Sequence, residues 1–98
     1  MPRVVPRPPL DATSKQEQEE LLAEFGMFLR AVRSQRDMSI ESAAEAAGIH
    51  PTYLGEVERG MRNVSLFNIW RIAGALGVPA HTLLEKLPQR KAVAASAT

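Results

Sequence analysis

The stretch "SIESAAEAAGIHPTYLGEVERG", Ser39 to Gly60, decides the fold of this chain. Ser39 suits the N-cap of a short helix over "IESAAEAA", and Glu41 lies in its first turn, where the helix dipole favours an acidic side chain. Gly48 suits the end of that helix, because glycine adopts the left-handed conformation of a C′ residue without steric cost. Pro51 fits the first position of a second helix, where its missing N–H is not needed. The stretch therefore predicts two short helices joined by a tight glycine turn.

The apolar residues of this stretch have the spacing that packs its two helices together. Ala43 and Ala44 are small where the helices cross, so the helices can approach closely. Ile49, Leu54 and Val57 then fill the core that both helices share. Two short helices joined in this way are typical of a helix-turn-helix, here at about residues 39–59.

Helical periodicity extends the prediction on both sides. Residues 14–36 place four apolar side chains on one face: Leu22, Phe25, Leu29 and Val32. Residues 66–76, with Ser65 as N-cap, present five apolar side chains inward: Leu66, Ile69, Ile72, Ala73 and Leu76. A last helix follows over residues 80–86. Because no run alternates as a β-strand does, the sequence predicts an all-α, compact five-helix domain.

The two ends of the chain differ in composition from its middle. Residues 1–13 are rich in proline and arginine, which indicates an extended arm. Either this arm has no role, or Arg3 or Arg7 enters a minor groove of a bound duplex. Residues 88–98 begin with a proline and continue in small residues, which indicates a flexible tail. The domain itself is expected over residues 14–87.

Composition excludes several classes of function. The 98-residue chain has no cysteine, and its two histidines are too few for a histidine metal site, so we expect no metal and no cofactor. No apolar run approaches the about 18 residues of a membrane span, and prolines interrupt the apolar N-terminus, so we expect a cytoplasmic protein without membrane contact. Without a glycine-rich phosphate loop or a histidine paired by motif with a nucleophile, the chain is not expected to be an enzyme.

The charge of the chain limits how it can bind nucleic acid. A formal net charge of +1 argues against a protein held on DNA by charge alone. Residues 11–24 are acidic, whereas arginines occur at residues 30–36 and again at residues 59–71. Any contact with DNA must therefore come from a local basic surface.

Residues 25–85 resemble the lambda-repressor-like helix-turn-helix family of Xre, Cro and CI-type regulators. The segment "HPTYLGEVERGMRNVSL", residues 50–66, is more narrowly similar to the controller proteins of restriction–modification systems. The resemblance implies five helices, a homodimer, and recognition of double-stranded DNA at two-fold-related operator half-sites about one DNA turn apart.

The resemblance also implies roles for individual residues. The candidates for contact with bases are the outward positions of the helix that begins at Pro51, which is the third predicted helix of the chain: His50, Pro51, Thr52, Gly55, Glu56 and Arg59. The candidates for contact with phosphates are Ser39, Tyr53, Arg62 and Asn63, together with the N-termini of the second and third helices. Arg33 and Glu58 match a pair that joins the first helix to the third, and we assign this pair to structure.

Three of the base-contact candidates have chemistry that suits either DNA or solvent. Thr52 can bond a base edge or a phosphate, and Arg59 can pair with guanine or hold a phosphate. Glu56 can accept from a cytosine amino group but otherwise repels the backbone, so a solvated side chain is an equal alternative for it. Ile40 and Pro51 stand where the family commonly has polar residues, and Gly55 replaces a frequent serine, which predicts few direct bonds to bases.

The fourth helix carries a second apolar face. Phe67, Trp70 and Gly74 follow one another at spacings of three and four, away from Ile69 and Ile72. Two large aromatic side chains on a second stripe indicate a second burial partner. We interpret this face as the dimer interface, completed by two residues of the last helix: His81 and Leu84. The alternative is a monomer in which the first helix covers the aromatic pair through two side chains: Leu21 and Phe28.

The leading hypothesis is a sequence-specific, dimeric transcriptional regulator that occupies an operator and excludes or recruits RNA polymerase. One alternative is an antitoxin-type protein-binding module in which the helix-turn-helix domain is secondary. Another is a helix-turn-helix fold that serves only for dimerisation, which the near-neutral charge leaves open. A fold resemblance alone does not distinguish these functions, so the hypothesis depends on the pattern of the site.

Overall fold

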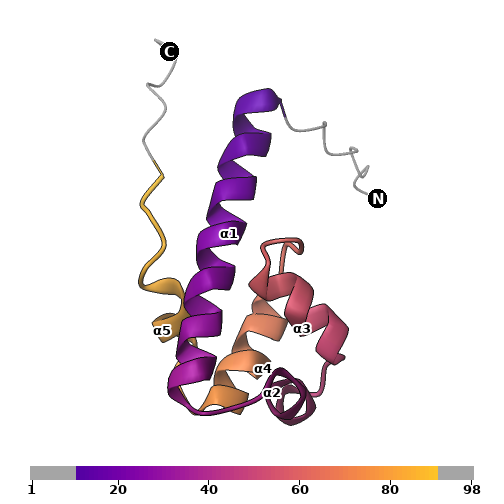
Figure 1. Ribbon diagram of the computed structural model, residues 1–98. Coiled ribbons are helices and arrows are strands. Elements are labelled where there is room, and N and C mark those ends of the chain that lie inside the picture. Colours follow the sequence, from indigo (N-terminus) through magenta and orange to yellow (C-terminus); the bar gives the residue numbers. More distant parts are fainter. Residues whose placement is uncertain (1–10, 91–98) are drawn as a thin grey trace, which may run out of the picture.

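The computed structural model describes residues 11–90, which fold into five helices without a strand (Figure 1). The helices are α1 (Ala12–Gln35), α2 (Ile40–Ala47), α3 (Pro51–Glu58), α4 (Leu66–Leu76) and α5 (Ala80–Leu84). The all-α, five-helix prediction is therefore confirmed for this part of the chain. Residues 1–10, which include Arg3 and Arg7, and residues 91–98 lie outside the described part of the chain.

Serine side chains cap the starts of α2 and α4, and a glycine ends α2, at the positions that the sequence predicts. Ser39 Oγ accepts from the Ser42 amide at 3.0 Å, and Ser65 Oγ accepts from the Asn68 amide at 3.1 Å. Each bond satisfies one of the amides that a helix N-terminus leaves without an intrahelical partner. Gly48 follows α2 in the left-handed conformation, with φ of 72°. This is a backbone conformation that most residues adopt only at a cost.

Two helix boundaries differ from the prediction by two residues, and the end of α1 at Gln35 differs from it by one. Helix α1 begins at Ala12 instead of residue 14, because the Asp11 carboxylate accepts from the Ser14 amide at 2.7 Å and caps the helix earlier. Helix α5 ends at Leu84 instead of residue 86, because the Leu87 amide turns back to the Leu84 carbonyl at 3.1 Å. Both differences change the length of an element and leave the order of the helices unchanged.

The core lies where α1, α2, α3 and α4 meet, and α5 closes it. Its buried side chains come from all five helices: Phe25, Leu29, Val32, Ala43, Ala44, Ala47, Leu54, Val57, Ile69, Ile72, Ala73, Leu76 and Leu83. Leu22 was also predicted to face the core, but it is half-buried and is not among the core side chains. Leu66 departs further from the prediction, since 74% of it is exposed. It is the first residue of α4, and a helical side chain leans toward the N-terminus of its helix, here past the edge of the core.

Helix α1 crosses the end of α3 at close range. A methyl group on Gly26 would overlap the carbonyl oxygens of Val57 and Glu58. Gly60, with φ of 76°, lies against the backbone of Ala23. Because backbone meets backbone at both positions, neither glycine can be replaced without moving a helix. We refer to Gly26 and Gly60, with the Arg33–Glu58 pair described below, as the α1–α3 seam.

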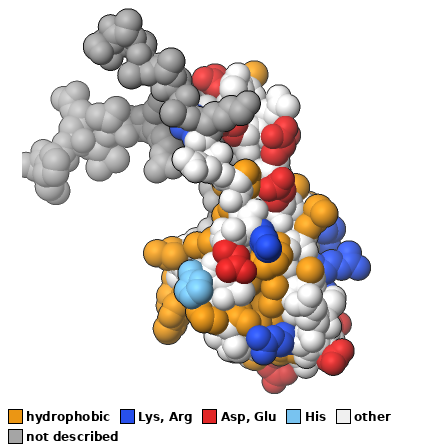
Figure 2. Space-filling model, turned by 90° about the vertical axis from the view of Figure 1, so that its left-hand side faces the viewer, with side chains coloured by type: hydrophobic (Ala, Val, Ile, Leu, Met, Phe, Trp, Pro, Cys, Tyr) orange, Lys and Arg blue, Asp and Glu red, His pale blue; other side chains and the backbone are white. Residues whose placement is uncertain are grey.

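The first half of α1 projects beyond the body of the domain (Figure 1). Figure 2 shows acidic side chains along this projection and hydrophobic side chains over the lower part of the same face. Arg90 donates to both oxygens of Glu17, at 3.1 Å each, so residues 88–90 lie along α1 and differ from the flexible tail expected from residue 88. None of the described helices is long and apolar enough to cross a membrane.

Candidate nucleic-acid interface

Helices α2 and α3 form the predicted helix-turn-helix around Gly48. The Gly48 amide donates to the Glu45 carbonyl at 3.1 Å, and the Ile49 amide reaches back to Ala44 at 3.0 Å. His50 then caps α3, since its Nδ1 accepts from the Thr52 amide at 3.0 Å. The turn thus satisfies the end of one helix and the start of the next within three residues.

Arg71 of α4 fastens this turn to the rest of the domain. Its Nε donates to the Ala47 carbonyl at 2.9 Å and its Nη2 to the Gly48 carbonyl at 2.7 Å. The Phe67 ring lies under the same guanidinium, 5.1 Å from its central carbon. A side chain on Gly48 would overlap the guanidinium of Arg71, so a larger residue would have to displace this contact in addition to adopting the left-handed backbone angle. Sequence reasoning missed this contact, because the two partners are 23 and 24 residues apart.

The structure places the six base-contact candidates along α3 with different exposure. His50, Thr52 and Arg59 are exposed, while Pro51 and Glu56 are half-buried. Gly55 is buried, although the sequence analysis treated it as an outward position. His50, Thr52 and Arg59 are thus the candidates of this segment whose polar side chains are exposed.

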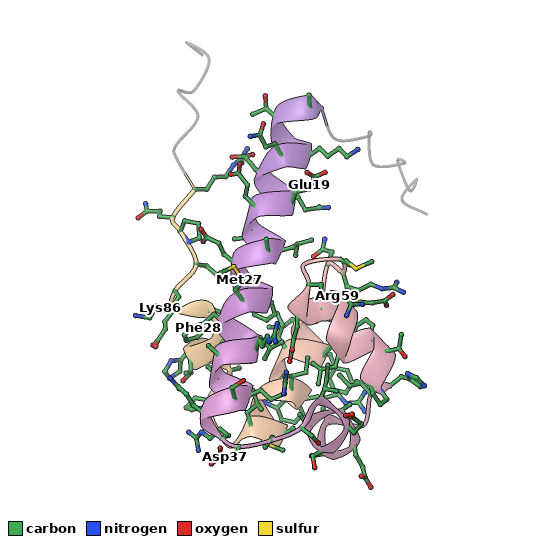
Figure 3. All side chains as sticks on the ribbon, viewed as in Figure 1. Glu19, Met27, Phe28, Asp37, Arg59 and Lys86 are labelled. Atoms are coloured by element: carbon green, nitrogen blue, oxygen red, sulfur yellow. The ribbon has the colours of Figure 1, made fainter. Side chains whose placement is uncertain are left out.

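The burial of Gly55 has a specific cause. A Cβ atom at this position would lie 3.2 Å from Arg59 Nη1 and 3.4 Å from Ile40 Cδ1. The guanidinium of Arg59 therefore folds back over Gly55 toward the start of α2, as its place four residues later on the same helix face allows. Figure 3 labels Arg59 at the C-terminal end of α3. The missing side chain at position 55 makes room for this cation.

Glu56 is engaged by a cation from the next loop. Its Oε1 accepts from Arg62 Nε at 3.0 Å. The guanidinium of Arg62 also lies 5.9 Å from the centre of the Tyr53 ring. The Tyr53 hydroxyl in turn accepts from Asn68 Nδ2 at 3.2 Å. A base-contact candidate and two phosphate-contact candidates are thus brought together in one cluster.

The other two phosphate-contact candidates lie at the edges of this surface. Ser39 is exposed, and its hydroxyl is already the cap of α2. Asn63 is exposed in the loop between α3 and α4, next to Arg62. The starts of α2 and α3 and this loop therefore surround the outer face of α3 with amides and a cation.

The Arg33–Glu58 pair, to which the sequence analysis gave a structural role, joins α1 to the end of α3. Arg33 donates from Nε to Glu58 Oε2 at 2.6 Å and from Nη2 to Oε1 at 2.9 Å, while its Nη1 donates to the Met38 carbonyl at 2.9 Å. The side chains are only 14% and 6% exposed. The hydrogen bonds that Arg33 donates to the Glu58 carboxylate raise the pKa of Arg33 above its ordinary value. The Arg33 guanidinium therefore stays charged, and its hydrogen bonds to Glu58 hold the end of α3 against α1.

The outer face of α4 carries three exposed apolar side chains, which we refer to as the α4 apolar patch: Leu66, Phe67 and Trp70. Phe67 and Trp70 are 60% and 64% exposed, and their rings stack 6.2 Å apart. A groove of about 420 Å³ runs from Trp70 along α4 to α5, and a Cβ on Gly74 within it would meet nothing. His81 is exposed at the start of α5, whereas Leu84 packs against the core.

Helix α1 does not cover this patch within the chain. Phe28 is half-buried against the core, on the side of α1 that faces α5 (Figure 3). Leu21 remains partly exposed on the projecting half of α1. In the described residues, the first helix therefore does not cover Phe67 and Trp70, as the monomer alternative had required.

A helix-turn-helix with an accessible second helix defines the class of this protein. The sequence pattern of the helix-turn-helix family matches residues 29–83, more than half of the chain. The chain belongs to this family, whose lambda-repressor-like members are transcriptional regulators and not enzymes, and the resemblance seen in the sequence is confirmed.

Individual relatives within this family include control proteins and regulators. The chain is 47% identical over 62 residues to the control protein C.BamHI of Bacillus amyloliquefaciens, covering 62% of this chain and 76% of that protein. The crystal structure of the restriction-modification controller protein C.AhdI from Aeromonas hydrophila is similar with a TM-score of 0.63 and 44% identity, covering 63% of this chain and 94% of that one. SinR, the master regulator for biofilm formation, was solved in complex with DNA. It is similar with a TM-score of 0.58 and 31% identity, over 61% of this chain and 97% of the chain in that structure.

Proposed function

We propose that this protein is a sequence-specific DNA-binding transcriptional regulator that acts as a homodimer on two-fold-related operator half-sites. The observation that carries the proposal is the outer face of α3, which is accessible and bordered by Arg59, Arg62 and the N-termini of two helices. A helix in this setting can enter the major groove while amides and cations bind the flanking phosphates. SinR, a relative with the same fold, has been solved with DNA, which supports this reading.

The cations at this surface explain how a chain with a net charge of +1 can bind DNA. The exposed acidic residues of α1 lie largely on its projecting half, whereas Arg59 and Arg62 lie at the end of α3. A local cluster is sufficient for phosphate contact, since each neutralised phosphate releases counterions regardless of the charge elsewhere. In the proposal, Thr52 and Arg59 are the main candidates for contact with base edges.

The α4 apolar patch supports the homodimer. Exposed aromatic side chains beside an open groove are typical of a surface that is buried by a partner. A second copy is the simplest partner, because a two-fold axis lets the same patch serve both protomers. Two copies would then present two α3 helices to one duplex. Occupation of an operator near a promoter would exclude or recruit RNA polymerase.

In vitro selection from a random double-stranded library tests this proposal. We expect enriched sites with two inverted half-sites about one DNA turn apart. Binding to the selected site should weaken steeply as salt rises, with a log–log slope that follows the number of phosphate contacts. Failure to enrich any sequence, at low or moderate salt, would contradict sequence-specific binding. Enrichment of single half-sites would contradict the homodimer.

A further inference from the structure

The carboxylate of Glu56 is only partly accessible on the outer face of α3. Its side chain is only 22% exposed, while that of its partner Arg62 is 54% exposed. A glutamate that reads cytosine must present its oxygens to the groove. Here one oxygen, Oε1, already accepts from Arg62 Nε at 3.0 Å. The exposed end of the pair is therefore the cation.

Arg62 is restrained by a second contact. Its guanidinium lies 5.9 Å from the centre of the Tyr53 ring, and the Tyr53 hydroxyl is held by Asn68. Cation–π contact and a charge-assisted hydrogen bond together limit the positions of a side chain that otherwise has many rotamers. The bond to Glu56 uses Nε, and the terminal nitrogens donate to no other described residue. These nitrogens form an edge of the fork that matches two oxygens of a phosphate.

We infer that Glu56 is a positioning residue: it holds Arg62 so that the terminal nitrogens of the guanidinium meet a DNA phosphate, and it does not read a base itself. This inference rests on the proposed function. An exposed ion pair contributes little to folding stability, so its main consequence is geometric. The pairing also offsets the repulsion between a bare carboxylate and the DNA backbone. Glu56 is thereby reassigned from the base-contact candidates to the backbone contact of Arg62.

A double-mutant cycle on DNA affinity tests this inference. Glu56→Gln, Arg62→Ala and the double variant are compared on the selected site, and Glu45→Gln on the exposed face of α2 is the control for loss of one negative charge. Relative to that control, Glu56→Gln should weaken binding by about threefold to tenfold in the unaltered background and by less than about twofold in the Arg62→Ala background. Base preference, measured by repeating the selection, should be unchanged at every position by Glu56→Gln.

Two results would overturn the inference while leaving the proposed function intact. One is an equal effect of Glu56→Gln with and without Arg62. The other is a change of preference at one base position that persists in the double variant, as expected of a residue that reads cytosine directly. Absence of binding by the unaltered chain would instead contradict the proposed function, and with it this inference. Circular dichroism of each variant shows whether it keeps its fold. Thr52→Ala, which leaves the Glu56–Arg62 pair in place, should keep the fold as well.

Discussion

The α1–α3 seam and the α4 apolar patch are two helix surfaces of opposite character. In the seam, glycines bring backbones together and a buried ion pair closes the gap. On the outer face of α4, aromatic rings stand in solvent beside a glycine that meets nothing. The first surface is covered within one chain, and the second stays exposed on it. The difference shows that residue type alone, glycine or aromatic, does not tell a surface that packs within the chain from one that stays exposed.

The largest effect is expected from breaking the ion pair of the seam. Glu58→Gln leaves the buried guanidinium of Arg33 without its counter-charge and should lower the free energy of unfolding by about 3–5 kcal/mol. Urea unfolding followed by circular dichroism measures it. The double variant Arg33→Met with Glu58→Met, which removes both charges, should be more stable than the single variant. A double variant that is no more stable would show that the charge of Arg33 is not the cause.

The next effect distinguishes the two glycines directly. Gly26→Ala should destabilise by about 3 kcal/mol, because its methyl group meets carbonyl oxygens that only a helix shift can move. Gly74→Ala, in the open groove, should stabilise the monomer by up to about 1 kcal/mol through higher helix propensity. Thermal unfolding of the two variants compares them. Equal shifts in Tm would mean that the seam is not as tightly packed as described.

Removing the aromatic side chain of the patch should affect assembly and leave folding unchanged. Trp70→Ala should weaken self-association by about 2 kcal/mol, or about 30-fold in Kd, as for an exposed aromatic residue that anchors an interface. Sedimentation velocity over a concentration series measures this. Met27→Ala, an equally exposed apolar residue of α1 outside the patch, is the matched control. If both variants keep the mass of the unaltered chain, the patch is not the dimer interface.

The clamp on the helix-turn-helix should have a smaller effect. Arg71→Ala leaves the carbonyl groups of Ala47 and Gly48 without their donors, and we expect a loss of about 1–2 kcal/mol in the free energy of unfolding. Hydrogen exchange of the turn amides should rise more than that of α1. Arg30→Ala, an exposed arginine of α1, is the control. Equal protection in both variants would contradict a specific role for Arg71.

The smallest effect concerns the first turn of α1, far from both surfaces. The amide of Ser14 donates to Asp11 and holds the pKa of that carboxyl below its ordinary value. Stability from this cap is therefore present above the ordinary pKa and is lost as the pH falls through the lowered value. The protection factor of the Ser14 amide, which is its exchange rate corrected for the intrinsic effect of pH, should fall between about pH 5 and pH 2. Asp11→Asn should abolish this dependence, and a dependence that persists would implicate another group.

The sequence predicted most of this fold because local rules and global packing agree in it. Ser39, Gly48 and Ser65 mark helix ends by their own chemistry, and apolar periodicity identified nearly the whole core. Leu66 was assigned to the core wrongly, since periodicity gives a face but not where along the helix that face stops being covered.

Contacts between residues far apart in the chain could not be predicted in the same way. Arg71 reaches the turn across more than twenty residues, and Gly26 looks like a weak point in a helix until α3 is placed against it. The Glu56–Arg62 pair likewise depends on how the loop folds back after α3. The family resemblance predicts which residues could face DNA, but it does not indicate which of them hold one another in place.

The space at Gly55 has a consequence for transplanting recognition helices between relatives. Serine at this position would add a hydrogen-bonding group, but it would also displace the guanidinium of Arg59. The displacement should cost little stability, because the Arg59 side chain is flexible. Positions 55 and 59 therefore behave as one unit of sequence. A graft that exchanges either residue alone should move the positive charge to a different place along the duplex, so specificity should transfer only when both are exchanged together.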